Sequence, residues 1–372
     1  MMTAPLSFRL TGATVLRDGQ MLDRSVAIED GRISKGPLPE VDLRGYYILP
    51  GIVDLHGAAF LRHMAPDQTL HTALRATDHA AAAHGVTTAW LSQGWGWSEQ
   101  GPHSPAAAES LLDALEDYRP EALSDLRIQI ACETHTVDTA ERLLAAVRRH
   151  RIDHVIFRNS LPDALMHSDL TPETHARLAQ AEAQKRAVPR YLCRLAEAFD
   201  TLGVSYGSYA DTDGETRETF SMIGAKLCVC PTRRSAAALA HAVGDPVVLR
   251  AGDVTKNTSP LSVTELIRSR LCDALASDIS YPSLAAAAFH LATSGVMTLP
   301  AAWALISQRP AQILRLHDRG VIDYGRRADL VIVNRDTLAV EGTLSRGRIT
   351  HLSGKAAARF MGLRADLAMA AE

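Results

Sequence analysis

Three side chains that could activate water lie far apart in the chain, and each stands directly behind a short, largely apolar run: His56, Glu133 and Asp278. An apolar strand that ends in Ser277-Asp278 has little structural need of a carboxylate. Imidazole and carboxylate groups ligate metal ions and accept protons. A bound metal lowers the pKa of its water towards ~7, so that a carboxylate can deprotonate the water as it attacks. The pattern therefore favours hydrolysis at a carbon or phosphorus centre.

A parallel barrel is the element that would bring these three residues together. From residue 52 onward, short apolar runs alternate with Ala-, Leu-, Glu- and Arg-rich stretches, as buried parallel strands alternate with crossover helices. Eight such units over about 265 residues fit a (β/α)8 TIM barrel, in which the carboxyl ends of the strands converge on one rim. The predicted strands span residues 52–55, 86–91, 127–132, 153–157, 203–207, 225–230, 246–250 and 271–277.

Both ends of the chain show a different pattern, typical of short antiparallel strands. Residues 6–49 alternate apolar and polar positions, and the Asp-Gly pairs at 18–19 and 30–31 suit tight hairpins. After a last helix near Leu299–Leu314, the segments 319–322, 328–333 and 344–349 again suggest strands. These strands have no barrel left to join, so we expect an α/β fold with a small β-sheet domain built from both termini. The expected parts are 1–50 and 317–354 for that domain, 51–316 for the barrel, and 355–372 for a helical or frayed tail.

Composition narrows the class of protein and its partners. The 372 residues are 47% hydrophobic and 22% charged, with a net charge of -3, which lacks the basic excess needed to bind nucleic acid. No apolar stretch is long enough for a membrane span, and the N-terminus does not resemble a signal peptide. The five cysteines form no CxxC pair, which favours a reducing compartment. We expect a cytoplasmic protein with a small-molecule substrate, and the oligomeric state, a homo-oligomer included, is left open.

Two long segments resemble the amidohydrolase superfamily. Leu-Pro-Gly-Ile-Val-Asp-Leu-His at 49–56 is similar to its strand-one signature, and the segments 309–314, 320–322 and 327–331 are similar to its C-terminal hallmark. His-Gly-Val-Thr-Thr at 84–88 fits strand two. Within the superfamily, the closest resemblance is to the phosphonate-metabolism triphosphate diphosphatases, which remove pyrophosphate from a ribosyl triphosphate. It rests on the segments 271–278, 281–284 and 287–289, on Cys132-Glu133, and on His63 and Pro66.

The resemblance implies roles for the three strand-end residues. His56 corresponds to a strand-one metal ligand, Glu133 to a metal-bridging or single-metal carboxylate, and Asp278 to a ligand that is also the general base. It implies a metal-dependent hydrolase that acts on a small phosphorylated or amide-bearing substrate. One divalent metal ion, zinc in the first instance, would be the cofactor.

Departures from the family pattern reduce the expected set of metal ligands. Ala58 stands where the superfamily has a second His and the phosphonate enzymes an Asp, and a methyl group has no lone pair. Arg158 and Tyr209 occupy strand ends where the relatives carry His. Because zinc sites need about three protein ligands, we expect at most one ion, with Tyr209, Asp211 or Cys230 as further helpers. The opposite hypothesis is that Arg158 replaces an ion and forms an anion-binding pocket without metal.

Five residues on the same rim are candidates for binding substrate: His63, Trp95, Arg158, Arg233 and Lys256. Trp95, with Trp97, would offer a flat surface for a ring, although packing within a loop is the alternative. Arg233 would bind phosphate or remain solvated. Lys256 lies in the loop 255–260, which is shorter than the corresponding loop of the resembled family and differs from it in sequence. A second functional hypothesis is a catalytically silent paralogue that binds a ligand or partner protein. Metal content separates it from the first.

Overall fold

The eight predicted parallel strands form a barrel. The structure, a computed structural model, describes all residues except 1–6, 65–67, 99, 162–171, 257–260 and 370–372. Each barrel strand pairs in parallel with the next strand along the chain, and a bridge between Gly57 and Asp278 links the last strand to the first. The strands are β8 (Ile52–Gly57), β9 (Val86–Trp95), β10 (Asp125–Glu133), β11 (His154–Arg158), β12 (Ser205–Tyr209), β13 (Leu227–Val229), β14 (Val247–Arg250) and β15 (Ala274–Ala276).

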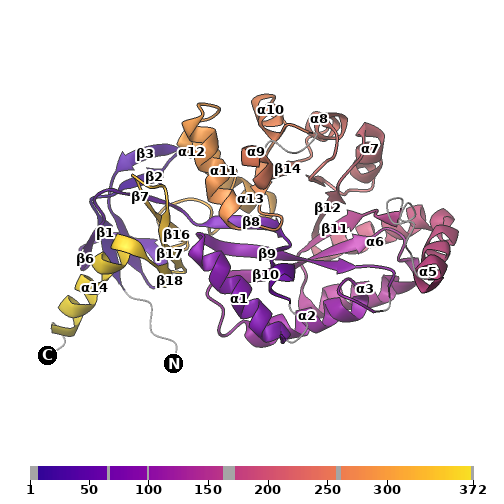
Figure 1. The fold of residues 1–372 in the computed structure, drawn as a ribbon, viewed down its shortest axis with the longest axis horizontal. Coiled ribbons are helices and arrows are strands. Elements are labelled where there is room, and N and C mark those ends of the chain that lie inside the picture. Colours follow the sequence, from indigo (N-terminus) through magenta and orange to yellow (C-terminus); the bar gives the residue numbers. More distant parts are fainter. Residues whose placement is uncertain (1–6, 65–67, 99, 162–171, 257–260, 370–372) are drawn as a thin grey trace.

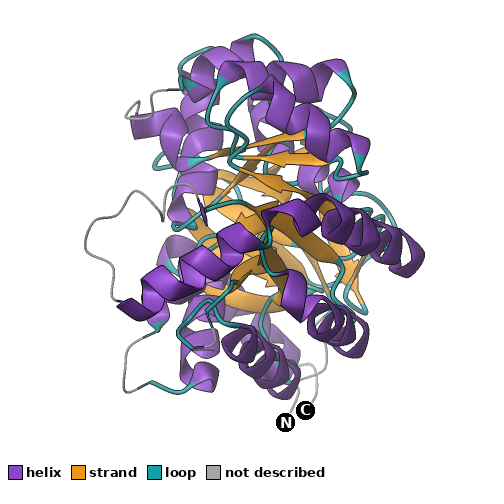
Figure 2. Ribbon diagram, turned by 90° about the vertical axis from the view of Figure 1, so that its right-hand side faces the viewer, coloured by secondary structure: helices purple, strands orange, loops and turns teal. Residues whose placement is uncertain are grey.

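Helices surround the strands, which occupy the middle of the molecule in Figure 2. The predicted last helix is two short helices, α12 and α13, and the predicted helical tail is α14. Among the described residues, no helix has the length and apolar character to cross a membrane. The helices are η1 (Ala59–His63), α1 (Leu70–Ala83), α2 (Pro105–Tyr118), η2 (Val137–Thr139), α3 (Ala140–His150), α5 (Pro172–Ala183), η3 (Lys185–Ala187), α6 (Val188–Leu202), α7 (Gly214–Met222), α8 (Arg234–Ala242), α9 (Gly252–Lys256), α10 (Val263–Arg268), α11 (Pro282–Thr293), α12 (Leu299–Ala304), α13 (Gln308–Ile313) and α14 (Gly354–Met369).

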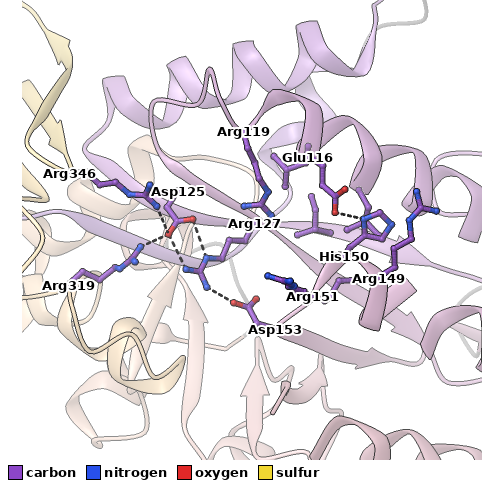
Figure 3. A pocket seen from close by; sticks show the side chains of 14 residues that line it. Glu116, Arg119, Asp125, Arg127, Arg149, His150, Arg151, Asp153, Arg319 and Arg346 are labelled. Carbon is purple, nitrogen blue, oxygen red and sulfur yellow. Dashed lines mark hydrogen bonds and ion pairs between the residues drawn. The ribbon is translucent and has the colours of Figure 1, made fainter. Parts of the chain in front are cut away.

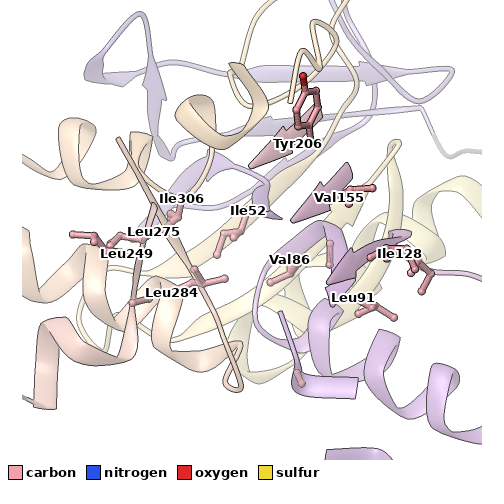
Figure 4. Close-up of a cluster of buried hydrophobic side chains, with 14 of the residues drawn as sticks. Ile52, Val86, Leu91, Ile128, Val155, Tyr206, Leu249, Leu275, Leu284 and Ile306 are labelled. Atoms are coloured by element: carbon pink, nitrogen blue, oxygen red, sulfur yellow. The ribbon is translucent and has the colours of Figure 1, made fainter. Parts of the chain in front are cut away.

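Two apolar layers hold the barrel together. The larger layer lies between the strands and the helices, where Ile52, Val155 and Leu275 pack against helix residues such as Leu284 (Figure 4). The smaller layer fills the barrel interior with residues that include Val53, and α13 contributes to it. Because side chains on a strand alternate between these layers, both faces of every barrel strand are buried, which explains the continuous apolar runs in the sequence.

The chain termini build the small β structure beside the barrel (Figure 1). The antiparallel pairing of β7 with β16 joins N-terminal and C-terminal strands in one six-stranded sheet, as predicted. Four other N-terminal strands form a separate sheet in the order β5-β4-β1-β6. The strands are β1 (Phe8–Thr11), β2 (Thr14–Arg17), β3 (Gln20–Asp23), β4 (Val26–Glu29), β5 (Arg32–Ser34), β6 (Glu40–Asp42), β7 (Tyr46–Pro50), β16 (Leu330–Asn334), β17 (Val340–Ser345) and β18 (Arg348–Leu352).

Turn chemistry explains where the hairpin prediction is confirmed and where it is wrong. Asp18 and Gly19 both have positive φ, 53° and 71°, the conformation of a type I′ hairpin turn between β2 and β3. The segment 319–322 is not a strand. Gly320 has φ 84° there, and a Cβ at that position would lie 2.9 Å from the Ser307 carbonyl oxygen. The chain at Gly320 therefore turns tightly against α13 and forms no strand.

Candidate active site at the barrel mouth

Polar side chains gather at the carboxyl ends of the barrel strands, where the sequence placed the site. One cavity of about 110 Å³ is lined there by His56, Ala58, Leu61, Ser92, Gly94, His103, Ala131, Ile156, Arg158, Tyr209 and Asp278. A second cavity of about 240 Å³ shares His103 and Arg158 with the first and is also lined by Glu133 and Ser160. His56, Glu133, Arg158 and Asp278 thus border one connected space.

His56 is fixed by a row of hydrogen bonds that crosses the barrel interior. Its Nδ1 lies 2.6 Å from Gln129 Oε1, and Gln129 Nε2 lies 3.1 Å from the Leu55 carbonyl oxygen and 2.5 Å from His154 Nε2. His154 Nδ1 in turn faces the Ser205 carbonyl oxygen at 3.2 Å. These residues come from β8, β10, β11 and β12, so the closed barrel itself holds the imidazole in place.

The same row determines which His56 nitrogen carries the proton. His154 Nδ1 must donate, because it faces a carbonyl, so its Nε2 accepts a hydrogen bond from the Gln129 amide. The Gln129 oxygen then accepts from His56 Nδ1–H, which leaves a lone pair on His56 Nε2. Burial lowers the pKa of His56, and it lowers the pKa of His154 to about 4. His56 is therefore a neutral imidazole whose Nε2 can accept a proton or a hydrogen bond.

Asp54 supports the base of the site but does not line it. It is fully buried, and its carboxylate accepts hydrogen bonds from Ser277 N at 3.0 Å and Ser277 Oγ at 2.6 Å. Gly57 makes room for this contact, because a Cβ there would lie 2.6 Å from Asp54 Oδ2. Through Ser277, Asp54 fixes the segment that leads into Asp278.

Asp54 also gives a prediction about pH. Burial raises the pKa of Asp54 to about 7, although the hydrogen bonds from Ser277 oppose the shift. The unfolded value is about 3.9, so between about pH 4 and 7 the folded state holds a proton that the unfolded state has lost. The stability that this proton provides is fully present below about pH 4 and is lost as the pH rises through about 7.

We expect the Asp54→Asn variant not to show this loss of folding stability with rising pH, because Asn carries no titratable proton. Between pH 4.5 and 6.5, the free energy of unfolding of the unmodified chain should fall relative to that of the variant, by up to about 1.4 kcal/mol per pH unit. Urea unfolding at several pH values measures the difference. The exposed control Asp336→Asn should keep the slope of the unmodified chain. Parallel slopes for Asp54→Asn and the unmodified chain would contradict the buried-proton account.

Asp278 is held at the mouth by its own backbone. Its φ is 55°, in the left-handed region that non-glycine residues rarely adopt. Asp278 N donates to the His56 carbonyl oxygen at 3.2 Å, and Ala58 N donates to the Asp278 carbonyl oxygen. The Asp278 side chain is 27% exposed, and its Oδ2 lies 3.4 Å from Arg250 Nε. The carboxylate is thus directed into the mouth beside a cation.

Glu133 is engaged by two neighbours from the next strand and its loop. Ser160 donates to it twice, from N at 3.0 Å and from Oγ at 2.5 Å, and Arg158 Nε lies 3.6 Å from Oε1. Burial raises the pKa of Glu133, while the Ser160 hydrogen bonds and the Arg158 charge oppose the shift. Each Glu133 oxygen therefore already accepts one hydrogen bond, and the charge of Arg158 lies beside the carboxylate, where it would repel a metal cation.

Two arginines share the ring of Tyr209. The guanidinium carbons of Arg158 and Arg250 lie 5.6 Å and 5.8 Å from the centroid of the ring, and Arg250 Nη2 donates to the Tyr209 hydroxyl at 2.7 Å. The Arg158 side chain is 49% exposed and that of Arg250 is 36% exposed. Arg158 lines both mouth cavities, whereas Arg250 lines a separate cavity of about 120 Å³ and meets the mouth through Tyr209 and Asp278.

The predicted metal ligands do not meet as one ligand group. Among the described residues, only Asp113, Glu116 and His150 place three ligand atoms within 4.8 Å of one another, and they lie on α2 and α3, outside the barrel. His56, Glu133 and Asp278 line the mouth, but their ligand atoms are not grouped in this way. With Ala58 offering no donor and both carboxylates beside arginines, the donor set at the mouth does not fit a metal ion.

Trp95 and Trp97 line the cavity of about 240 Å³, whereas three other predicted binding residues lie outside both cavities. The Trp95 side chain is otherwise enclosed, and its Nε1 donates to Thr139 Oγ1 at 3.0 Å. His63 ends η1, Arg233 is the exposed N-cap of α8, and Lys256 ends α9. None of the three lines either cavity. Of the loop 255–260, residues 257–260 lie outside the described residues.

The two expected helpers other than Tyr209 have structural roles. Asp211 is buried against the fully buried Arg217 at 3.3 Å and accepts from Ser208 Oγ at 2.7 Å. Burial raises the pKa of the Cys230 thiol to about 12, so it remains protonated at neutral pH.

Sequence reasoning missed several residues of the site, among them Arg250, Gln129, Ser160 and His103, which lines both cavities. Arg250 ends the run Val-Val-Leu-Arg, and a charged residue at the end of an apolar strand is the signal by which it could have been found. Gln129 lies four residues before Glu133 on the same strand, so the two-residue period places both on one face. Its hydrogen bonds depend on the closure of the barrel, which no local pattern shows.

Comparisons with known proteins place this geometry in context. Residues 163–355 match the model of an amidohydrolase family. The chain is 27% identical over 365 residues to alpha-D-ribose 1-methylphosphonate 5-triphosphate diphosphatase of Escherichia coli strain K12, covering 88% of this chain and 95% of that protein. The β-aspartyl dipeptidase of Fervidobacterium islandicum AW-1 has a similar fold, with a TM-score of 0.66, 14% identity and coverage of 94% and 97% of the two chains. The dihydropyrimidinase of Brevibacillus agri NCHU1002 also has a similar fold, with a TM-score of 0.64 and 14% identity. The match covers 93% of this chain and 95% of that chain.

Proposed function

The chain belongs to the amidohydrolase family, and from this membership we propose that it hydrolyses a small phosphorylated substrate bound between Arg158 and Arg250. It is a hydrolase related to the E. coli diphosphatase, whose name specifies a ribosyl triphosphate. The observation that carries the proposal is the pair of partly exposed arginines around Tyr209 at the mouth. Guanidinium groups bind phosphate through paired hydrogen bonds, and two of them would stabilise the charge that develops as water attacks phosphorus.

The chain supplies a base and an acceptor for the attacking water. In the proposed step, the water oxygen forms a bond to phosphorus while the bond from phosphorus to the leaving phosphate oxygen breaks. The water proton passes to the Asp278 carboxylate, and the leaving group departs as a phosphate or diphosphate anion. The lone pair on His56 Nε2 would orient the water, since Gln129 fixes the ring with Nδ1–H directed away from the mouth.

Members of the family generally bind divalent metal ions, and zinc held by His56, Glu133 and Asp278 is the arrangement that the family resemblance implies. The residues at the mouth do not fit that ion, because Arg158 and Arg250 take the positions beside the two carboxylates. No step of the proposal is therefore routed through a metal.

A panel of substrates tests the reaction class. Phosphate and diphosphate release would be measured with alpha-D-ribose 1-methylphosphonate 5-triphosphate and with a nucleoside triphosphate, and amide cleavage with a dihydropyrimidine and a dipeptide. We expect release from a phosphorylated member only. Turnover of an amide without turnover of any phosphate ester or anhydride would overturn the proposal.

Metal removal gives a further expected result. Dialysis against a chelator should change kcat by less than twofold, and elemental analysis of protein purified without chelator should find well under one zinc, manganese or iron per chain. The substrate would be the phosphorylated compound turned over in the panel. A loss of activity that zinc restores would instead support the metal site of His56, Glu133 and Asp278.

A further inference from the structure

Another cavity, larger than the two at the mouth, lies at the opposite end of the barrel, where the strands begin. It has a volume of about 680 Å³, within the range of small-molecule sites. Its lining comes from the amino ends of β10 and β11, from α2 and α3, and from two segments beyond the barrel helices. Six arginines line it: Arg119, Arg127, Arg149, Arg151, Arg319 and Arg346. We call this cavity the arginine pocket.

Carboxylates satisfy only part of this charge. Three carboxylates line the pocket against the six arginines, and two more outside the lining, Asp113 and Asp318, pair with Arg149 at 2.9 Å and Arg319 at 2.8 Å. Asp125 lies 3.0 Å from Arg127, 2.6 Å from Arg319 and 3.9 Å from Arg346. Burial would raise the pKa of Asp125, but its ion pairs hold that pKa well below the usual range. Asp125 is therefore a fixed anion that already organises three of the cations.

Arg119 and Arg151 have no such partner. Neither side chain makes a hydrogen bond or ion pair with another described residue, and no dashed line reaches either in Figure 3. Arg119 is the C-cap of α2, and Arg151, with φ 52°, is the C-cap of α3. Cations favour helix C-termini, which accounts for each residue alone. It does not account for the convergence of both on one cavity whose other four arginines are already paired with carboxylates.

We propose that the arginine pocket binds an oligophosphate, a small anion with two or more linked phosphate groups. The pocket exceeds the needs of a single phosphate, and the planar guanidinium fork matches phosphate oxygens. Arg119 and Arg151 come from the barrel, whereas Arg319 and Arg346 come from the C-terminal segments that join the small β structure. A bound oligophosphate contacting both sets ties these parts of the molecule together, at the end of the barrel away from the catalytic mouth.

Calorimetric titration with inorganic triphosphate tests the proposal. The titration uses Arg250→Gln protein, in which the mouth is weakened as a competing anion site, at constant ionic strength. We expect binding that becomes at least tenfold weaker when Arg119→Gln and Arg151→Gln are added. Neither side chain has a partner to lose, so both substitutions should leave the fold intact. The matched control is Arg148→Gln, an exposed arginine on α3 outside the pocket, and it should leave the affinity unchanged.

Three outcomes would overturn the proposal. The first is no binding of triphosphate to the Arg250→Gln protein. The second is an equal loss in the Arg148→Gln control, which would indicate general charge attraction. The third is equal affinity for triphosphate and orthophosphate, which would indicate a single-phosphate site. As a second measurement, triphosphate should slow the reaction of phenylglyoxal with Arg119 and Arg151, as followed by peptide mapping.

Discussion

Replacing Asp278 by Asn is expected to lower kcat about 10³-fold, within the range for loss of a positioned general base. Asn has the same shape, and it tolerates the left-handed backbone conformation that residue 278 adopts. The substitution therefore removes the proton acceptor without straining the turn that follows β15. Steady-state kinetics with the phosphorylated substrate from the panel measures the effect.

Two controls separate chemistry from folding. Asp117→Asn, on the exposed face of α2, should retain full kcat. Urea unfolding should show that Asp278→Asn changes the free energy of unfolding by less than about 1 kcal/mol, because the ion pair with Arg250 is partly exposed. If Asp278→Asn keeps more than a tenth of kcat, Asp278 is not the base, and His56 Nε2 becomes the group to replace.

The architecture could be predicted because most barrel strands are short apolar runs that are buried on both faces, such as Val-Val-Leu at 247–249 and Ala-Leu-Ala at 274–276. The strand that ends at Glu133 alternates instead, with Ile128 and Ile130 in the outer layer and Gln129 on the opposite face. The hairpins could be predicted from Asp-Gly pairs that need positive φ. The structure of segment 319–322 could not be predicted in this way. Its apolar residues suggest a strand, but the segment forms a tight turn that depends on the packing of Gly320 against α13.

The site could be predicted only as far as its strand ends. His56, Glu133 and Asp278 follow apolar runs, so the barrel topology alone places them on the rim. Their partners depend on which strands become neighbours after closure. Glu133 meets Arg158 because β10 pairs with β11, and Asp278 meets Arg250 because β14 pairs with β15. Pairing with a guanidinium changes a carboxylate from a metal ligand into half of an ion pair, and a list of residues does not show that change.

Replacing Arg250 by Gln is expected to lower kcat/KM for the phosphorylated substrate by about 10² to 10³, a loss typical of one stabilising donor at a charged transition state. Arg250 contacts both the Tyr209 hydroxyl and Asp278. Its loss therefore removes one cation and also a contact that holds each of these two side chains in place. Arg250→Lys should recover part of the loss, since it restores the charge but not the planar fork. Arg268→Gln, on the exposed face of α10, is the control and should match the unmodified enzyme.

The charge of the substrate determines how this result is interpreted. For a phosphorylated substrate, the inhibition constant for product diphosphate should weaken together with kcat/KM, because both anions use the same guanidinium. For a neutral amide substrate, Arg250→Gln would leave KM almost unchanged, and the arginines would serve only to balance Glu133 and Asp278. A normal kcat/KM with weakened inhibition by diphosphate would mean that Arg250 binds anions without contributing to the reaction. The kinetic split therefore tests whether the cations at the mouth act on the substrate or only on the protein.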